Sequence, residues 1–310
     1  MKVVFVASGN KAVGNVSPFV QTQFESLQTE GLNMRLFPVS GKGFKGYLRA
    51  FVDLRRLIKN EHPDIVHAHY SVCGYVAYLA SLMTHTRVVV SILGSFPRKS
   101  IKLHIVRFCI RHCWDRTIVK SQRTAKQLGM ELPVIPNGVD LEKFSVMDVS
   151  EARALCGFES DKKYIIWCSN PSRPEKNYSL AQQAVALLND SKVVLYPVYD
   201  KVHEEVVKYM CAADVLLLTS KNEGSPNVIK EALACNCPIV STDVGDVAKN
   251  LKGVDGTYVA TDESPEQISC LLRKALSYNH RTQGRARLIE KKLTTPLVAK
   301  KIINLYHSCL

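Results

Sequence analysis

The 310-residue sequence lacks an apolar run long enough to cross a bilayer, since no stretch approaches the roughly 18 residues that a spanning helix needs. Its first nine residues are apolar over too short a length for a signal peptide and predict a first buried strand instead. We therefore expect a cytoplasmic protein. Hydrophobic residues make up 46% and charged residues 22% of the chain, which excludes a disordered tail protein and a fibrous repeat.

Metal-binding patterns are also missing. The ten cysteines are scattered, and neither Cys235 with Cys237 nor Cys109 with Cys113 has a second pair that would complete a tetrahedral site. Without an export signal we expect reduced thiols. No Asp-x-Asp pair occurs that could seat a divalent cation, so we expect neither a metal nor a resident cofactor.

The glycine fingerprint of dinucleotide-binding proteins, GxGxxG, is absent, because four residues separate Gly9 from Gly14. This disfavours a hydride-transfer enzyme.

Acidic residues are scarce, with 28 Asp and Glu against 41 Lys and Arg and a net charge of +13. Residues 98–126 hold nine Lys or Arg, and Asp115 is their one acid. Such a surplus suggests nucleic acid, a phosphate-bearing substrate or acidic lipid as partner. No RRM, KH or zinc-finger pattern and no set of stacking aromatics accompanies the basic cluster, so nucleic acid is not the expected partner.

Short apolar runs alternate with amphipathic helical patterns, which predicts an α/β protein with parallel sheets covered on both faces. The length favours two domains, with a hinge at the turn Pro136–Asp140. We expect an N-terminal domain over 1–145, a C-terminal domain over 146–295 and a final helix over 296–310 that packs back on the first domain. Two such sheets would bring their ligand loops to a cleft between the domains. The predicted strands are Lys2–Ala7, Asn33–Val39, Asp64–Ala68, Arg87–Ile92, Thr117–Val119, Pro133–Ile135, Tyr164–Cys168, Lys192–Tyr196, Val215–Thr219 and Pro238–Ser241.

The segment 214–243 carries the clearest chemistry. A buried strand runs into a loop, after which Ser225 is a natural N-cap and Pro226 suits the first turn of a helix that ends near Ala234. The unpaired N–H groups of that helix start form a site for phosphate or a sugar oxygen.

Two carboxylates, Glu223 and Glu231, flank this helix start. A pyrophosphate would repel them, so vicinal sugar hydroxyls are the better partners. The plainer alternative is a helix-terminus acid and an ordinary exposed glutamate.

Glu223 and Glu231, with seven residues between them inside Glu-Gly-Ser-Pro-Asn…Lys-Glu-Ala, resemble the Glu-x7-Glu signature of family 4 retaining glycosyltransferases of the GT-B fold. In this fold, two Rossmann-like parallel-sheet domains face a central cleft. Further segments similar to the family follow its order along the chain: Asp64–Tyr70, Trp114–Ser121, Val134–Phe144 and Pro174–Asn177. The resemblance is to bacterial enzymes of cell-surface polysaccharide synthesis.

The resemblance implies a donor site. Glu223 would bind hydroxyls of the transferred sugar, Glu231 would bind the ribose diol, and Lys176 with Arg173 would neutralise the leaving nucleoside diphosphate. Backbone amides of the segment between the two acids would hold the sugar and β-phosphate, namely those of Gly224, Ser225, Asn227 and Val228, with Pro226 shaping the turn. Arg173 and Lys176 could alternatively be a solvated loop pair.

The resemblance also implies the reaction, which is transfer of a hexose-type sugar from a nucleotide-sugar to a glycan or lipid-linked acceptor. UDP is the expected nucleotide. Retention by front-face attack is expected, because no paired carboxylates for double displacement are evident. No metal is expected, so Lys and Arg must supply the positive charge.

The sequence departs from the family in three places. Pro171 occupies the position of the usual phosphate-loop arginine, leaving Arg173 as the nearby candidate. Leu93-Gly94 replaces a common His-Gly, and the segment Tyr196–Asp214 is short.

For the acceptor side we expect Gly14, Asn15, His69, Gly94 and Ser95, which lie in or beside loops after the predicted N-terminal strands. A histidine at a strand end is also commonly structural, and His67 more so than His69.

In the predicted helix Ser100–Cys113, spacing places His104, Arg107 and Arg111 on one face and apolar residues on another. This pattern suits an anionic membrane surface or a lipid diphosphate acceptor, which would make the protein peripheral at the membrane. A solvated charged face is the alternative.

Other functions stay open. They are a catalytically weak GT-B subunit, a GT-B epimerase, which would need an acid/base pair, a phosphorylase, which would need a cofactor lysine or an oxyanion site, and a basic nucleic-acid-binding protein.

Overall fold

The structure is a computed structural model that describes residues 1–9, 16–41, 43–94 and 100–310. Three predicted acceptor-side residues, Gly14, Asn15 and Ser95, lie outside the described residues. The chain divides into two compact units. Unit 1 comprises Met1–Gly138 and Thr295–Leu310, and unit 2 comprises Val139–Thr294.

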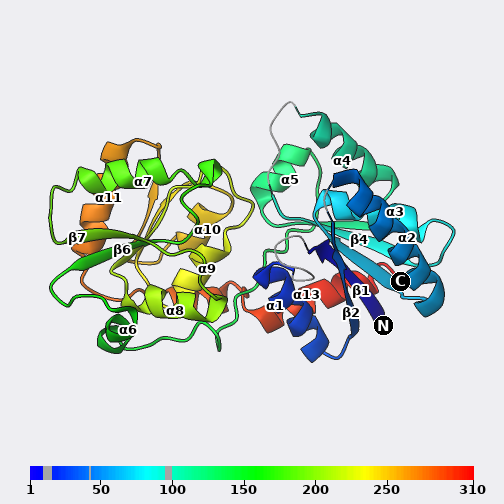
Figure 1. Ribbon diagram of the computed structural model, residues 1–310, viewed down its shortest axis with the longest axis horizontal. Coiled ribbons are helices and arrows are strands. Elements are labelled where there is room, and N and C mark those ends of the chain that lie inside the picture. Colours follow the sequence, from blue (N-terminus) through cyan, green and yellow to red (C-terminus); the bar gives the residue numbers. More distant parts are fainter. Residues whose placement is uncertain (10–15, 42, 95–99) are drawn as a thin grey trace. The chain divides into compact units, whose positions relative to one another are not determined.

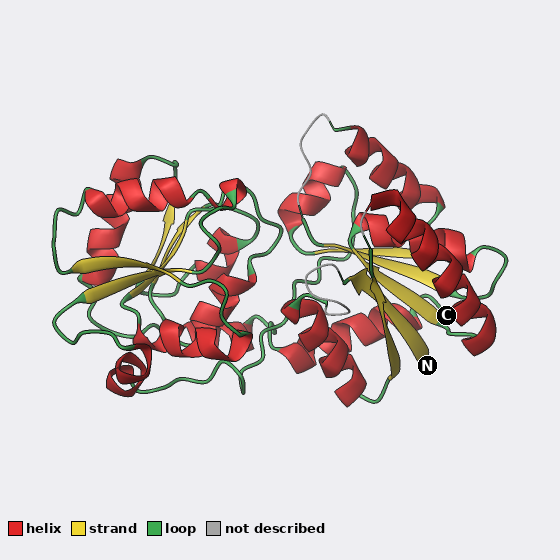
Figure 2. Ribbon diagram, in the orientation of Figure 1, coloured by secondary structure: helices red, strands yellow, loops and turns green. Residues whose placement is uncertain are grey.

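Unit 1 is built on a five-stranded sheet in the order β2-β1-β3-β4-β5, and every pairing is parallel (Figures 1 and 2). Its inner strands β1, β3 and β4 are apolar runs buried on both faces, as parallel sheets covered by helices require, whereas the edge strand β2 is partly exposed. The strands are β1 Lys2–Ser8, β2 Asn33–Val39, β3 Ile65–His69, β4 Arg87–Ile92 and β5 Arg116–Val119.

Side chains alternate between two helical layers in unit 1. Val3 and Phe5 point toward α1 (Pro18–Thr29) and α13 (Thr295–His307), whereas Val4 and Val6 point toward the other layer. That second layer contains α2 Gly43–Glu61, α3 Ser71–Ser81, α4 Ile101–His112 and α5 Gln122–Leu128. The sheet is therefore doubly wound.

Helix α13 supplies part of this core although it ends the chain. Tyr306 is fully buried, and its hydroxyl lies 2.5 Å from Nδ1 of His67, whose Nε2 lies 2.8 Å from Ser91 Oγ. His67 is thus a hydrogen-bonded core residue, which agrees with its structural interpretation.

Unit 2 contains a second five-stranded parallel sheet, in the order β10-β9-β8-β6-β7. Its strands are β6 Lys163–Trp167, β7 Val193–Pro197, β8 Val215–Leu218, β9 Ile239–Thr242 and β10 Thr257–Ala260. The edge strand β10 was not predicted. The strand expected at Pro133–Ile135 is wrong, because only Val134 pairs there, in an isolated bridge to Val119.

Helices cover both faces of the second sheet. One layer contains α6 Val149–Cys156, α8 His203–Ala212, α9 Asn227–Ala234, α10 Val247–Leu251 and α12 Gly284–Glu290. The other contains α7 Tyr178–Ala186 and α11 Pro265–Leu276. A short 3₁₀ turn, η1 Pro174–Lys176, lies between β6 and α7.

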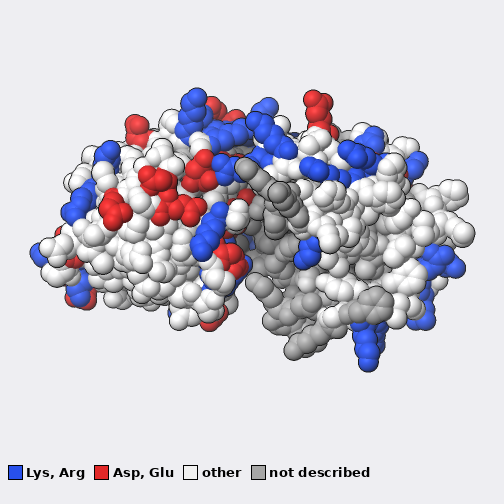
Figure 3. Space-filling model, turned by 90° about the horizontal axis from the view of Figure 1, so that it is seen from above, with Lys and Arg blue, Asp and Glu red and all other residues white. Residues whose placement is uncertain are grey.

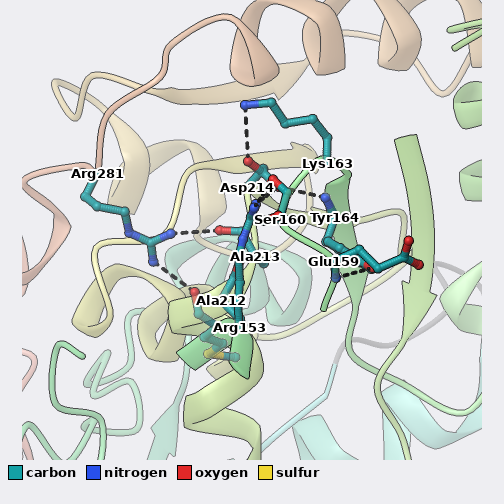
Figure 4. A network of polar contacts seen from close by, with 10 residues as sticks. Arg153, Glu159, Ser160, Lys163, Tyr164, Ala212, Ala213, Asp214 and Arg281 are labelled. Atoms are coloured by element: carbon teal, nitrogen blue, oxygen red, sulfur yellow. Dashed lines mark hydrogen bonds and ion pairs between the residues drawn. The ribbon is translucent and has the colours of Figure 1, made fainter. Parts of the chain in front are cut away.

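A polar network fixes the amino ends of β6 and β8 (Figure 4). The Asp214 carboxylate accepts hydrogen bonds of 2.7 Å from the Tyr164 amide and from Arg153, and Lys163 Nζ lies 3.5 Å away. Arg153 and Arg281 also donate to backbone carbonyls of Ala212 and Ala213. This edge of the sheet is therefore occupied by structural contacts and leaves the opposite edge for ligand loops.

Among the helices that the structure describes, none combines the length and the apolar character that a membrane span requires.

Candidate functional site

The candidate site lies at the carboxyl edge of the sheet in unit 2. From β6 the chain moves to β7 on one side and then returns to β8 on the other, so β6 and β8 flank a topological switch point. Ligands of open α/β sheets bind at such points, outside the carboxyl ends of the strands. The loops that follow β6 and β8 carry Lys176 and Glu223, respectively.

Buried hydrogen bonds hold these two loops together. Thr219, directly after β8, accepts a 2.9 Å bond from Trp167 Nε1 and donates toward the carbonyls of Lys176 and Asn177, each 3.0 Å away. The Lys221 amide also donates to the Glu175 carbonyl at 3.0 Å. The lysine and glutamate loops therefore form one assembled surface.

Lys176 Nζ forms an ion pair with Glu223 Oε1. Both side chains are largely buried, with exposed fractions of 18% and 17%. Two residues 47 positions apart in the sequence, both predicted for the donor site, are thus in direct contact. The pair sets an ammonium group suited to phosphate beside a carboxylate suited to hydroxyls.

Arg173 lies differently. It precedes η1, and its guanidinium pairs with Glu175, with Nε 2.8 Å from Oε1. Both side chains are about half exposed. The Glu175 backbone amide and then Arg173 lower the pKa of the Glu175 carboxyl. The structure thus places Arg173 in the same loop as Lys176 but not against Glu223.

The loop after Glu223 is braced from beneath. Ser225 Oγ donates to Asp246 Oδ2 at 2.8 Å, and Lys230 Nζ lies 3.1 Å from the same hydroxyl. The prediction that Ser225 caps the helix is therefore wrong: α9 begins at Asn227, its N-cap is Pro226, and the serine hydroxyl is held by Asp246 instead. The helix does end at Ala234, as predicted.

Lys230 is almost fully buried. Burial lowers the pKa of its ammonium group, and the carboxylates of Asp246 and Glu231 oppose that shift. The buried lysine therefore braces the serine loop from within the fold.

A glycine contact shapes the same loop. Gly245 has a φ of +59°, and a Cβ atom added there would lie 2.5 Å from the Gly224 carbonyl oxygen. Any side chain at this position would displace the backbone after Glu223. The site therefore requires glycine on the loop that follows β9.

Glu231 lies on α9, which starts from the loop after β8, and its carboxylate adds to the larger effect of burial in raising the pKa of the Cys168 thiol, directly after β6. Glu223 and Glu231 thus both belong to the carboxyl edge of one sheet. The remaining predicted donor residues, Gly224, Asn227 and Val228, lie between them in the loop and the first turn of α9.

Sequence reasoning missed three supporting residues: Thr219, Lys230 and Asp246. The first was placed in the strand and given no role. For Lys230, the one available signal of burial was that its i+3 and i+4 neighbours, Leu233 and Ala234, are apolar.

Of the residues predicted for the acceptor side, His69 lies at the carboxyl end of β3 in unit 1, fully buried and stacked on His67 with a ring-centroid distance of 4.6 Å. Neither ring nitrogen of His69 has a hydrogen-bond partner among the residues that the structure describes. Burial, followed by His67 and Lys120, lowers its pKa well below the usual value, so the ring is neutral. Gly94 follows β4 and is exposed.

Helix α4 corresponds to the basic segment Ser100–Cys113. The sequence predicted that Arg107 and Arg111 lie on one basic face of this helix. The guanidinium of Arg107 is not open to a ligand there, because it donates to the carbonyls of Leu128 and Gln127 at 2.9 and 3.0 Å. The apolar residues Ile101 and Phe108 are exposed to solvent.

Within the described ranges, no group of three or more His, Cys, Asp or Glu side chains is arranged to hold a metal ion.

Two family descriptions match consecutive parts of the chain. "Glycosyltransferase Family 4" matches residues 16–143, and "Glycosyl transferases group 1" matches residues 159–277. TuaC of Bacillus subtilis, named as a glycosyltransferase of teichuronic acid biosynthesis, is 26% identical over 71% of this chain. That match covers 62% of TuaC, so the chain spans about three fifths of this relative's length.

A galactosyltransferase of Escherichia coli, named for the substrates UDP-Gal and α-D-GlcNAc-diphosphoundecaprenol, is 24% identical over 73% of this chain and 70% of its own length. Among solved structures, Anabaena HepE in complex with UDP-glucose matches with a TM-score of 0.77 and 15% identity, covering 99% of this chain and all of the other. That likeness establishes a shared fold. The chain belongs to the family 4 glycosyltransferases, and its two parallel sheets are those of the GT-B fold.

Proposed function

We propose that this protein transfers a hexose-type sugar from a UDP-sugar to a glycan or lipid-linked acceptor, with retention at the anomeric carbon. The observation that carries the proposal is the Lys176–Glu223 pair at the switch point of the second sheet. UDP and a diphosphate-linked lipid appear in the names of relatives, which supports this choice of donor and acceptor.

Each proposed role follows from charge. Lys176 releases Glu223 and contacts the diphosphate, and Glu223 then accepts hydrogen bonds from hydroxyls of the transferred sugar. Glu231 accepts from the ribose diol, and backbone amides at the start of α9 hold the phosphate. Arg173, on the exposed rim of the same loop, exchanges Glu175 for a phosphate oxygen.

The chemical step is a front-face displacement. The bond between the anomeric carbon and the β-phosphate oxygen breaks, and its electron pair stays on the nucleoside diphosphate. The acceptor oxygen bonds to the anomeric carbon on the same face, and its proton passes to the leaving phosphate oxygen. Lys176 stabilises the charge that develops on the diphosphate, an effect worth about 3 kcal/mol for one well-placed donor.

We also propose that the transfer needs no divalent cation, because Lys176 and Arg173 supply the positive charge at the phosphates. Transfer in the presence of a chelator should then equal transfer with added Mg²⁺ or Mn²⁺. A strict requirement for either ion would contradict this part of the proposal.

The function is tested by a calorimetric screen of UDP-, GDP- and ADP-sugars, followed by transfer to a polyprenyl-diphosphate-linked sugar. We expect UDP-sugars to bind and an α-linked donor to give an α-linked product by NMR. An inverted linkage would refute the mechanism. Absence of binding to every nucleotide-sugar would refute the function and favour the catalytically weak subunit.

A further inference from the structure

Lys230, in the first turn of α9, is buried within unit 2, with an exposed fraction of 1%. Lysine is almost never fully buried unless its charge is paired, and Figure 3 shows Lys and Arg side chains in blue at the surface. Among the Lys and Arg residues that the structure describes, Lys120 of unit 1 is the one other that is buried. Because taking an ammonium group out of water costs free energy, the burial of Lys230 points to a charged partner inside the fold.

Asp246 supplies a negative charge from a different element. It is the N-cap residue of α10, yet its side chain makes no capping hydrogen bond to that helix. Aspartate at an N-cap commonly accepts from the amides of its own first turn, so this carboxylate is used elsewhere. Its Oδ2 accepts a 2.8 Å hydrogen bond from Ser225 Oγ, and its charge opposes the lowering of the Lys230 pKa that burial causes. Asp246 therefore reaches away from α10 to the loop after β8.

The lysine and the aspartate meet at one hydroxyl group. Ser225 Oγ donates its proton to Asp246, and Lys230 Nζ, 3.1 Å away, donates to the same oxygen. A serine hydroxyl has one donor and two acceptor sites, so the two contacts fix both its position and its direction. The backbone is held at the same place, because a Cβ atom on Gly245 would lie 2.5 Å from the Gly224 carbonyl oxygen. The loop is therefore held by contacts from α9 and from the start of α10.

The hydroxyl that is fixed in this way belongs to the segment proposed to hold the donor. The amides of Gly224 and Ser225 are proposed to bind the sugar and the β-phosphate, and both residues lie within two positions of Glu223. Groups that stabilise a developing charge must be placed to within about 0.5 Å, and a misplacement of about 1 Å can lower the rate about 100-fold. The contacts that fix Ser225 thus have a direct consequence for the reaction.

We propose that Lys230 and Asp246 are positioning residues of the donor site, which act through the Ser225 hydroxyl to hold the neighbouring backbone amides where the leaving diphosphate requires them. This inference rests on the proposed function. Lys230 and Asp246 act without touching the donor, unlike the Lys176–Glu223 pair, which meets phosphate and sugar directly. The alternative is that Lys230 and Asp246 only neutralise each other, in which case they stabilise the fold and leave the reaction unaffected.

The test is steady-state transfer from the preferred UDP-sugar, with the melting temperature as the measure of fold. Ser225→Ala removes the hydroxyl and leaves both charged groups in place. It should lower kcat at least about tenfold, change the KM for the UDP-sugar by less than about threefold and keep the melting temperature near that of the wild type. This split is expected because the amides stabilise charge that develops in the transition state more than they stabilise the bound donor.

The charged residues are tested singly and together. Lys230→Met and Asp246→Ala each leave the opposite charge without its partner, so each single variant should melt at a lower temperature, and the double variant should regain most of that loss. The kcat of the double variant should nevertheless stay at least about tenfold below the wild-type value, because the hydroxyl has lost both partners. Lys274→Met and Ser277→Ala replace an exposed lysine and an exposed serine of unit 2, and these matched controls should keep the wild-type kcat.

Wild-type kcat in Ser225→Ala would overturn the inference, as would recovery of kcat together with stability in the double variant. A raised KM with unchanged kcat would overturn it as well, by showing an effect on donor binding alone. If a charge variant fails to fold, Ser225→Ala carries the test. None of these results bears on the proposed function, since the wild-type chain still transfers sugar in each of them. A wild-type chain that transfers no sugar would refute the proposed function, and this inference with it.

Discussion

Replacing either member of the Lys176–Glu223 pair should separate the recognition of phosphate from the recognition of sugar. Lys176→Met removes the ammonium group, and Glu223→Gln keeps the shape of the side chain but removes its charge. The matched control is Lys192→Met, an exposed lysine at the other edge of the same sheet. The ligands are UDP, which has the diphosphate without a sugar, and the preferred UDP-sugar.

The magnitudes follow from the contact. A hydrogen bond from a charged group to phosphate contributes about 1.5–3 kcal/mol. Before UDP binds, Lys176 must leave Glu223, and because the phosphate then replaces the carboxylate as its partner, this exchange costs up to about 1 kcal/mol. The net loss for Lys176→Met is then about 0.5–2 kcal/mol, or about 2- to 30-fold in UDP affinity.

Glu223→Gln should act in the opposite way on UDP. It frees Lys176 for the phosphate, so UDP binding should be unchanged or up to about fivefold tighter. The UDP-sugar should lose at least tenfold in affinity, because an amide accepts hydroxyl hydrogen bonds more weakly than a carboxylate. Isothermal calorimetry measures the affinity of each of the two variants for UDP and for the UDP-sugar.

The reasoning fails if Glu223→Gln weakens UDP as strongly as Lys176→Met does. It also fails if Lys176→Met binds UDP as well as the Lys192→Met control. In either case the pair would be a structural salt bridge that takes no part in donor recognition.

Three other predictions concern the framework. Asp214→Ala should lower the free energy of unfolding by about 3 kcal/mol in urea titrations, because it leaves a largely buried guanidinium without its partner; a loss below about 1 kcal/mol would contradict this. Burial lowers the folded-state pKa of His67 and His69, so the unfolded chain binds more protons below pH 6.5. Stability should then fall as pH drops from 6.5, by up to about 2.8 kcal/mol per unit for two groups. Replacing both His67 and His69 with Gln should remove most of this pH dependence of the free energy of unfolding in urea titrations, whereas the control His85→Gln should keep it. Gly245→Val should lower UDP-sugar affinity at least tenfold while the protein stays folded in a thermal melt, because the added side chain displaces the backbone after Glu223. Unchanged affinity would show that the loop adapts.

Most of the fold could be predicted because buried parallel strands have an unambiguous pattern. β1, β4 and β8 are apolar runs bounded by polar residues, and their positions agree with the predictions within a residue or two. Edge elements gave less signal. β10 has three half-buried residues and one buried one, and Val134 stands between two prolines, whose missing N–H groups prevent a longer ladder.

The donor loops could be located from the sequence, but their contacts could not. Ser225 has the local signature of an N-cap, and only the folded chain brings Asp246 within 2.8 Å of its hydroxyl. Likewise, nothing local distinguishes a lysine that pairs with Glu223 from one that faces water, since the two residues meet through the order of β6 and β8. Long-range polar partners are decided by topology, which a local pattern does not contain.

Unit 1 is assembled from both ends of the polypeptide, with Tyr306 of α13 filling its centre beside β3. During synthesis the first 138 residues leave the ribosome with one face of their sheet incompletely covered. Unit 2 is a single continuous segment and can fold as soon as it has emerged. Residues 1–138 are therefore synthesised before unit 2, yet unit 1 is completed only when Thr295–Leu310 has been added and has emerged.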